Sequence, residues 1–127
     1  MKELKKTEII KKNYEFKYFF KKGKYYSGSI IEVYLFNNTL NVNKLGIVVS
    51  KKIGGSVIRN KIKRYIRSAY TDIEDDINTC CNLLIVWKKS ISHEKANYFD
   101  IKNELISILK SSNNIEERIW KRFLLYY

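Results

Sequence analysis

Residues 45–67 read LGIVVSKKIGGSVIRNKIKRYIR, and the change of pattern within this stretch decides the fold. Its first part, residues 45–52, is rich in β-branched apolar residues and predicts a strand. Gly54 and the glycine after it end that strand and turn the chain. Ser56 is then a candidate N-cap for a helix that runs to about Ile73. A strand, a glycine turn and a helix in direct succession indicate a domain in which helices pack on a sheet.

The flanking sequence supplies further helices and strands on both sides of this stretch. Thr7 is a candidate cap for a first helix, and Gly23 is a candidate stop signal for it. In chain order we expect a helix at 7–22, a strand at 25–36 with a break at Gly28, a short strand near 40–42, the strand and helix described above, a strand at 82–88, a helix at 98–109 and an additional C-terminal helix at 115–127. The expected order, α-β-β-β-α-β-α, describes a small α/β domain, an α+β sandwich.

The chain has 127 residues, which suits one domain over residues 1–127, with a core at about 7–110 and an extension at 111–127. Apolar residues make up 45% of the chain, so a packed core is expected rather than disorder. No run of about 18 apolar residues is present, which argues against a transmembrane helix. Because the N-terminus is charged from Lys2 onward and lacks an apolar signal core, we expect a cytoplasmic protein without a membrane partner.

The charge of the chain points to a polyanionic partner. Its formal net charge is +12, from 25 basic and 13 acidic residues. Nucleic acid is the leading candidate for such a partner, and an anionic membrane surface is the second. The two cysteines, Cys80 and Cys81, are adjacent and lack the spacing of zinc ligands, so we expect reduced, half-buried thiols at the start of a strand.

The basic residues of the quoted stretch gather on one side of its helix. Residues 51–67 hold seven basic residues among seventeen and no acidic residue. On a helical wheel, one arc about 100° wide is apolar. It comprises Ile58, Ile62, Tyr65, Ile66, Ala69 and Ile73. The next arc is about 140° wide and comprises Arg59, Asn60, Lys63, Arg64 and Arg67. One side of the helix is therefore suited to the core and the other to an anion.

Charged helix faces are usually only solvated, but such faces mix signs through Glu–Lys pairs four residues apart. Here like charges repeat at that spacing, which destabilises a helix by a few tenths of a kcal/mol per pair, about 0.2–0.5. A polyanion relieves this repulsion. Arginine suits phosphate because its guanidinium binds two oxygens at once, and Asn60 can read a base edge or a 2′-hydroxyl. These residues by themselves indicate a nucleic-acid-binding helix.

The stretch at 45–67 closely resembles the signature of the bacterial ribonuclease P protein family. That family carries a strand ending in S-K-K, a glycine loop and then V-x-R-N-R-x-K-R-x-x-R. Lys61 stands here where the family has the second arginine of R-N-R, which keeps the charge but loses the bidentate fork. Residues 11–23, KKNYEFKYFFKKG, also resemble the family's first helix, F-x-x-V-F-x-x-G. Tyr18 and Phe19 stand where the family commonly has smaller residues.

The resemblance implies a fold and a function. It implies an α/β sandwich with a left-handed β-α-β crossover, although crossovers are right-handed as a rule. It implies the protein subunit of a ribonucleoprotein endoribonuclease that removes the 5′ leader of precursor tRNA and forms the mature 5′ end. The catalytic RNA, ribonuclease P RNA, uses Mg²⁺ for hydrolysis, and the protein supplies neither a catalytic group nor a metal site. The implied partners are that RNA and precursor tRNA.

The resemblance also assigns residues. The RNA-binding strip comprises Arg59, Asn60, Lys61, Lys63, Arg64 and Arg67, with Lys51 and Lys52 nearby. The leader would lie in a cleft that uses Phe16, Phe20 and Tyr34, because any base can stack on an aromatic ring. Helical spacing alone favours core packing for Phe16 and Phe20, and the resemblance reverses that preference, for Phe16 more than for Phe20.

Nothing in the sequence has the pattern of a protein active site. His93 is the only histidine and stands in a loop-like stretch. An acidic run comprises Asp72, Glu74, Asp75 and Asp76. We interpret it as a solubilising turn that forms salt bridges with the basic surface, since two-metal nucleases need carboxylates from separate elements.

Three other functions compete with this interpretation. A generic RNA-binding or ribosomal-type protein would share the charge and the helix, but the aromatic residues and the S-K-K-glycine-R-N segment argue against it. A metal-dependent protein nuclease would cleave RNA without an RNA cofactor. A helix that reads the DNA major groove would alternate polar residue types, whereas an almost purely cationic face suits backbone phosphates better.

Overall fold

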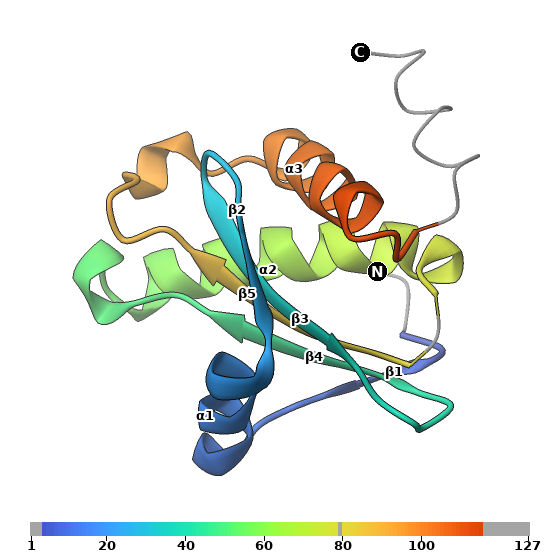
Figure 1. The fold of residues 1–127 in the computed structure, drawn as a ribbon. Helices are drawn as coiled ribbons and strands as arrows, with labels where there is room; N and C mark the ends of the chain where they lie inside the picture. Colours follow the sequence, from blue (N-terminus) through green and yellow to red (C-terminus); the bar gives the residue numbers. More distant parts are fainter. Residues whose placement is uncertain (1–3, 79, 116–127) are drawn as a thin grey trace.

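The computed structural model describes residues 4–78 and 80–115. The strands and α-helices are β1 (Thr7–Ile9), α1 (Asn13–Lys22), β2 (Lys24–Ser27), β3 (Ile31–Asn37), β4 (Asn43–Val48), α2 (Ser56–Ile73), β5 (Cys81–Trp87) and α3 (Tyr98–Ser111). Three short 3-10 helices are η1 (Lys51–Ile53), η2 (Glu74–Asp76) and η3 (His93–Lys95). The strands form one mixed five-stranded sheet in the order β1-β4-β5-β3-β2. Figure 1 shows α2 and α3 on one side of this sheet and α1 on the other.

The alternation of side chains along β3 separates the two faces of the sheet. Ile31, Val33 and Leu35 are buried in the main core, which α2 and α3 cover. Tyr34 and Phe36 point to the opposite face, where they pack against a smaller apolar cluster under α1. Successive side chains of a strand point to opposite faces, so the even-numbered residues of β3 belong to the α1 face. This face carries the aromatic residues of the candidate functional site.

The central strand β5 is buried along its whole length. It pairs in parallel with β4 and antiparallel with β3. Leu83, Ile85 and Trp87 join the main core, and Leu84 and Val86 join the cluster under α1. Full burial of a side chain of this size stabilises the fold by about 1.5–3 kcal/mol. A strand covered on both faces explains why residues 82–88 read as a continuous apolar run.

α2 connects two neighbouring parallel strands, β4 and β5, and therefore forms a β-α-β crossover. Its apolar side packs inward as the wheel predicts, with Ile62, Ile66, Ala69 and Ile73 fully buried. The helix ends at Ile73, as predicted. The left hand of the crossover stays a prediction from the family resemblance.

The N-terminal segment differs from the predicted helix at 7–22. Residues 7–9 form β1, which pairs in parallel with β4, and α1 begins only at Asn13. Thr7 is therefore not a helix cap. The N-cap of α1 is Lys12, which makes no side-chain capping hydrogen bond. Ile9 belongs to the strand, where pairing with a distant segment outweighs the local helical spacing.

Smaller corrections concern the element boundaries. The predicted strand near 40–42 is a bend, and the predicted strand at 45–52 is β4 followed by η1. The N-cap of α2 is Gly55, and Ser56 is the first helical residue. The break at Gly28 is confirmed, because β2 and β3 form an antiparallel hairpin around it. Of the predicted helix at 115–127, residues 116–127 lie outside the described residues, and Ile115 forms an isolated bridge with Ile77.

The acidic run is not only a solubilising turn. Glu74 is buried, with 2% of its surface exposed. Its carboxylate accepts hydrogen bonds from the backbone N–H groups of Lys5, at 2.9 Å, and Lys6, at 3.2 Å. It also accepts one from the Thr7 hydroxyl at 2.5 Å. Because a buried carboxylate is tolerated only when it is well hydrogen-bonded, Glu74 fixes the segment that leads into β1.

Candidate nucleic-acid interface

The RNA-binding strip lies along one exposed side of α2. Asn60, Lys61, Arg64 and Arg67 are exposed, and Arg59 and Lys63 are half-buried. Lys51 and Lys52 are exposed in η1, just before the glycine turn. The structure therefore brings all eight predicted cationic and amide residues to the loop and helix that follow β4.

Two members of the strip make contacts that the helical wheel does not show. The Nε atom of Arg59 donates a hydrogen bond to the carbonyl oxygen of Gly54 at 3.2 Å. This bond ties the guanidinium to the glycine turn and orients it. The Nζ atom of Lys61 lies 5.9 Å from the centroid of the Tyr65 ring, within the range of a cation–π contact. Lys61 is thus directed toward an aromatic ring on its own helix.

α1 contributes an aromatic side chain to the same region. A hollow of about 410 Å³, here called the Phe16 cleft, separates α1 from α2. Its lining comprises Ile9, Ile10, Phe16, Ile47, Asn60, Lys63, Arg64 and Arg67. An apolar floor and ring are thus placed beside three cations and one amide. Stacking surfaces next to cations are the two components of a single-stranded nucleic-acid site.

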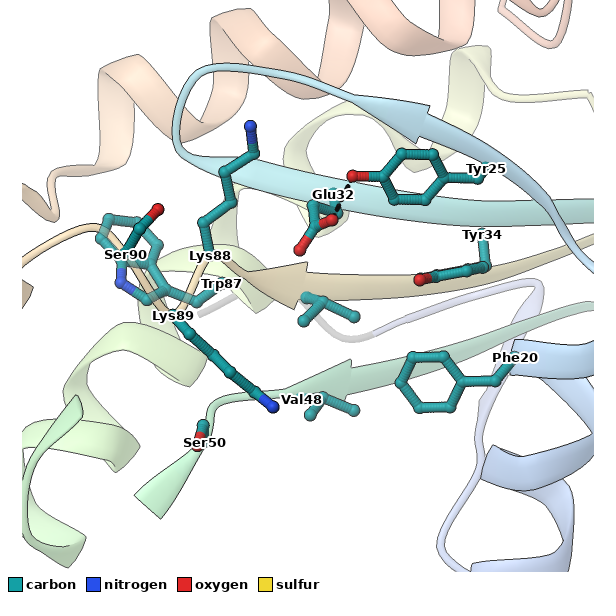
Figure 2. A pocket seen from close by; sticks show the side chains of 11 residues that line it. Phe20, Tyr25, Glu32, Tyr34, Val48, Ser50, Trp87, Lys88, Lys89 and Ser90 are labelled. Atoms are coloured by element: carbon teal, nitrogen blue, oxygen red, sulfur yellow. Dashed lines mark hydrogen bonds between the residues drawn. The ribbon is translucent and has the colours of Figure 1, made fainter. Parts of the chain in front are cut away.

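A second hollow of about 560 Å³, here called the Phe20 cleft, opens on the α1 face of the sheet. Its lining comprises Phe20, Tyr25, Glu32, Tyr34, Val48, Ser50, Val86, Trp87, Lys88, Lys89 and Ser90. Figure 2 shows Phe20 projecting from α1 toward Val48 of β4, with Tyr34 and Tyr25 above it and Lys89 extending toward the same valine. The cleft has an aromatic wall at one end and two lysines at the other.

Ring contacts hold the aromatic wall in place. Phe20 and Tyr34 meet edge to face with centroids 4.9 Å apart, and Tyr34 and Tyr25 lie 5.3 Å apart. Gly23 allows α1 to approach β3 this closely, because a Cβ atom on it would lie 2.8 Å from the Cβ atom of Tyr34. Phe20 nevertheless keeps 41% of its surface exposed. An ordered but exposed ring is available for stacking without prior rearrangement.

The polar groups of the Phe20 cleft are also oriented. The Tyr25 hydroxyl donates a hydrogen bond to a carboxylate oxygen of Glu32, the next residue but one from Tyr34. Desolvation by burial, together with the nearby charges of Glu32 and Tyr25, raises the pKa of the Tyr34 phenol above its usual 10.0. Tyr34 therefore remains a neutral hydrogen-bond donor at physiological pH.

The three predicted leader residues do not share one hollow. Phe20 and Tyr34 line the Phe20 cleft, whereas Phe16 lines the Phe16 cleft with the strip. Phe16 and Tyr34 both pack against the apolar cluster under α1, although the two clefts have no lining residue in common. Helical spacing alone favours the core for Phe16 and Phe20, but Phe16 is only half-buried against this cluster and Phe20 is exposed. The buried ring of α1 is Phe19.

Sequence reasoning missed several residues of the Phe20 cleft. Lys88 and Lys89 directly follow the buried strand β5, and Tyr25 and Glu32 belong to the β2–β3 hairpin. The position of Lys88 and Lys89 directly after an apolar strand was the one local feature of the sequence that could have indicated this part of the cleft. Tyr25 and Glu32 face each other only because the hairpin pairs Lys24–Ser27 with residues 32–35, which the sequence pattern alone does not specify.

The described residues contain neither a cluster of metal ligands nor a helix that could span a membrane. Within residues 4–78 and 80–115, no three His, Cys, Asp or Glu side chains come together as a set of metal ligands. Glu74, the buried acid of the acidic run, is occupied by backbone donors. In the same part of the chain, no helix combines the length and the apolar character that a membrane span requires.

Comparisons with known proteins show the family of the chain. The family model described as Ribonuclease P matches residues 4–113. The ribonuclease P protein component of Clostridium botulinum (strain 657 / Type Ba4) is 40% identical over 108 residues, which cover 84% of this chain and 96% of the relative. That of Bacillus cereus (strain G9842) is 37% identical over 110 residues, which cover 86% and 94%.

Solved structures give the same result for the fold. The RNase P protein of Staphylococcus aureus superposes with a TM-score of 0.74 at 32% identity, covering 85% of this chain and 97% of that one. The RNase P protein of Thermotoga maritima superposes with a TM-score of 0.73 at 26% identity, covering 82% and 96%. The chain therefore belongs to the ribonuclease P protein family, the protein component of the bacterial ribonucleoprotein endoribonuclease ribonuclease P.

Proposed function

We propose that this protein binds ribonuclease P RNA through the RNA-binding strip and holds the 5′ leader of precursor tRNA in the Phe20 cleft. The observation that carries the proposal is the position of α1, which places Phe16 in one hollow with the cations of α2 and Phe20 in another with Tyr34 and two lysines. The protein promotes removal of the leader and formation of the mature 5′ end. The hydrolysis itself is performed by the RNA with Mg²⁺, and the protein supplies no catalytic group.

The Phe20 cleft suits a leader of varied sequence. Phe20, Tyr34 and Tyr25 offer ring surfaces and edges, and a stacked base contributes about 1–3 kcal/mol whatever its identity. Lys88 and Lys89 supply positive charge for the phosphates at the open end. Precursor tRNA carries the leader and mature tRNA does not, so these contacts favour the substrate over the product.

The strip supports binding of the catalytic RNA. Its arginines and lysines lie in one row on a rigid helix, where they neutralise closely spaced phosphates. Neutralising about six phosphates makes affinity fall roughly 10³-fold between 50 and 200 mM salt. The same charge reduces repulsion where two RNA molecules meet, so less Mg²⁺ is needed for cleavage. Arg59, which is anchored on Gly54, couples this row to the glycine turn.

A direct test is cleavage of a precursor tRNA at low Mg²⁺ by the protein alone, by a bacterial ribonuclease P RNA alone and by both together. We expect cleavage only with both. Cleavage by the protein alone would show a metal-dependent nuclease instead. No effect of the protein on a working RNA would favour a generic RNA-binding or ribosomal-type protein, which shares the strip but has no use for the Phe20 cleft.

A further inference from the structure

α1 presents a second pair of aromatic side chains on the side away from Phe16 and Phe20. Successive residues of a helix are rotated by about 100°, so the side chains of Tyr14 and Tyr18 point in directions about 40° apart. The side chain of Phe19 points in a direction between those of Tyr18 and Phe20. Phe19 is buried against the sheet, which fixes the rotation of the helix. Tyr14 and Tyr18 keep 66% and 53% of their surfaces exposed. They are therefore not needed for the core.

These tyrosines line a third hollow of about 510 Å³, here called the Tyr18 groove. Its lining comprises Tyr14, Glu15, Tyr18, Phe19, Leu40, Lys44 and Asn82. Leu40 comes from the bend before β4 and is itself exposed. Tyr14, Tyr18 and Leu40 thus present exposed apolar surface around one hollow, next to Lys44.

The tyrosines of the groove are oriented before any ligand binds. Tyr18 meets Phe36 of β3 edge to face, with centroids 5.6 Å apart and an interplanar angle of 85°. Phe36 is held in turn by Phe19, with centroids 5.1 Å apart. The Nζ atom of Lys12 lies 5.8 Å from the centroid of the Tyr14 ring, so the second tyrosine of the groove has a cation beside it.

We propose that the Tyr18 groove binds single-stranded RNA, namely the part of the precursor tRNA leader that extends beyond the Phe20 cleft. This inference rests on the proposed function. Tyr14 and Tyr18 stack bases, and Lys12 and Lys44 contact phosphates.

The position of the groove on the sheet supports the leader as its occupant. β4 contributes Lys44 to the groove and Val48 to the Phe20 cleft, and β5 contributes Asn82 and Val86 in the same way. Each pair is four residues apart on one face of a strand, which corresponds to about 13 Å. The two sites therefore lie at opposite ends of the same two strands, with α1 between them. One single strand that passes α1 can occupy both.

Charge distinguishes RNA from a second copy of the protein. A second copy would bring another chain of net charge +12 to a groove that is lined by Lys44 and that has Lys12 beside its Tyr14 ring. A polyanion is attracted by the same charges. Glu15 is the one acid that lines the groove, and it belongs to the first turn of α1, where a carboxylate is favourable for the helix itself.

The test compares precursor tRNAs with leaders of about 5 and about 15 nucleotides, lengths near the lower and upper ends of the single-strand site sizes of small binding folds. Equilibrium binding is measured with the holoenzyme, assembled from the full chain and a bacterial ribonuclease P RNA, with cleavage suppressed. We expect the wild type to bind the long leader more tightly. The double variant Tyr14→Ala/Tyr18→Ala loses about fivefold or more per stacked base for the long leader only.

The control variants separate this inference from the proposed function. Phe20→Ala should weaken binding of both leaders, and Phe99→Ala, an exposed aromatic of α3 on the other side of the sheet, should weaken neither. The groove proposal alone is overturned if the wild type binds the two leaders with equal affinity. It is also overturned alone if the double variant binds the long leader as tightly as the wild type while Phe20→Ala still weakens binding. If neither the double variant nor Phe20→Ala weakens binding, the proposed role of the Phe20 cleft is overturned as well. Self-association that the double variant abolishes would assign the groove to a second copy and so contradict RNA.

Discussion

Phe16 of α1 and Arg64 of α2 line the same hollow, although they lie on different helices and belong to different parts of the sequence motif. Sequence reasoning assigns Phe16 to the leader and Arg64 to the catalytic RNA. The shared cleft means that a ligand in contact with one side chain is close to the other. The two residues are therefore expected to act together.

A double-mutant cycle tests this coupling. Phe16→Ala and Arg64→Ala are each expected to weaken binding of precursor tRNA by the holoenzyme. The loss of binding free energy in the double variant should differ from the sum of the two single losses by about 0.5 kcal/mol or more, because residues that contact the same ligand are energetically coupled. Phe20→Ala combined with Arg64→Ala should be additive, since Phe20 lines the other cleft. Additivity in both cycles would contradict the shared site.

Removal of single cations from the strip should change the salt dependence of RNA binding. Arg64→Ala and Arg67→Ala each delete one phosphate contact, so the slope of log K against log salt for the RNA subunit should become shallower by about 1 per substitution. Filter binding or fluorescence titration at several salt concentrations measures the slope. Lys95→Ala, an exposed lysine of η3, is the matched control and should leave the slope unchanged.

Loss of the Phe20 ring should affect substrate and product differently. Phe20→Ala removes one stacking surface and should weaken precursor binding about five- to a hundredfold, the equivalent of about 1–3 kcal/mol, with mature tRNA unaffected. The ring is partly exposed and the fold should tolerate its loss, which circular dichroism can check. An equal loss for precursor and mature tRNA would mean that Phe20 contacts the tRNA body.

The buried carboxylate of Glu74 should be important for stability. Glu74→Ala leaves the backbone donors of Lys5 and Lys6 and the Thr7 hydroxyl without their acceptor. We expect a loss of about 2–3 kcal/mol in the free energy of unfolding, because hydrogen bonds to a charged group are worth about 1.5–3 kcal/mol. Chemical denaturation measures the change. Asp75→Ala, at an exposed neighbour in η2, should have little effect.

Alkaline pH should destabilise the fold through a buried thiol. Burial, followed by the proximity of Cys80, raises the pKa of Cys81 from 9.0 to about 11. The folded state therefore keeps its proton when the unfolded state has lost it, so the stabilisation is complete below about pH 9 and is lost as pH rises toward about 11.

Thermal unfolding of wild type and Cys81→Ala between neutral pH and pH 11 measures this dependence. The decline should be clearly smaller in Cys81→Ala and only slightly smaller in Cys80→Ala, because burial is the larger cause of the raised pKa of Cys81. Burial likewise raises the pKa of Tyr70 to about 12, so some decline above pH 10 should persist in both variants. Identical profiles for wild type and Cys81→Ala would contradict the role of the thiol.

Local sequence predicted most of the elements. The strand and helix around the glycine turn, the buried strand β5 and helix α3 all follow from short-range periodicity and turn residues. β1 was missed because it comprises only Thr7–Ile9 and exists through parallel pairing with Asn43 to Leu45. A strand that depends on a distant partner leaves little signal in its own residues.

The sequence by itself determined which residue types face outward on α2, because the helical repeat separates apolar and cationic side chains without reference to the rest of the chain. It also determined, through the family motif, that the partner is RNA. Only the tertiary structure decided how the aromatic residues are distributed. Burial of Phe19 between β3 and β5 fixes the rotation of α1, and this rotation sends Phe16 toward the strip, Phe20 toward Tyr34 and Tyr18 toward the opposite groove. Such a choice depends on packing between segments far apart in the chain, which no local pattern encodes.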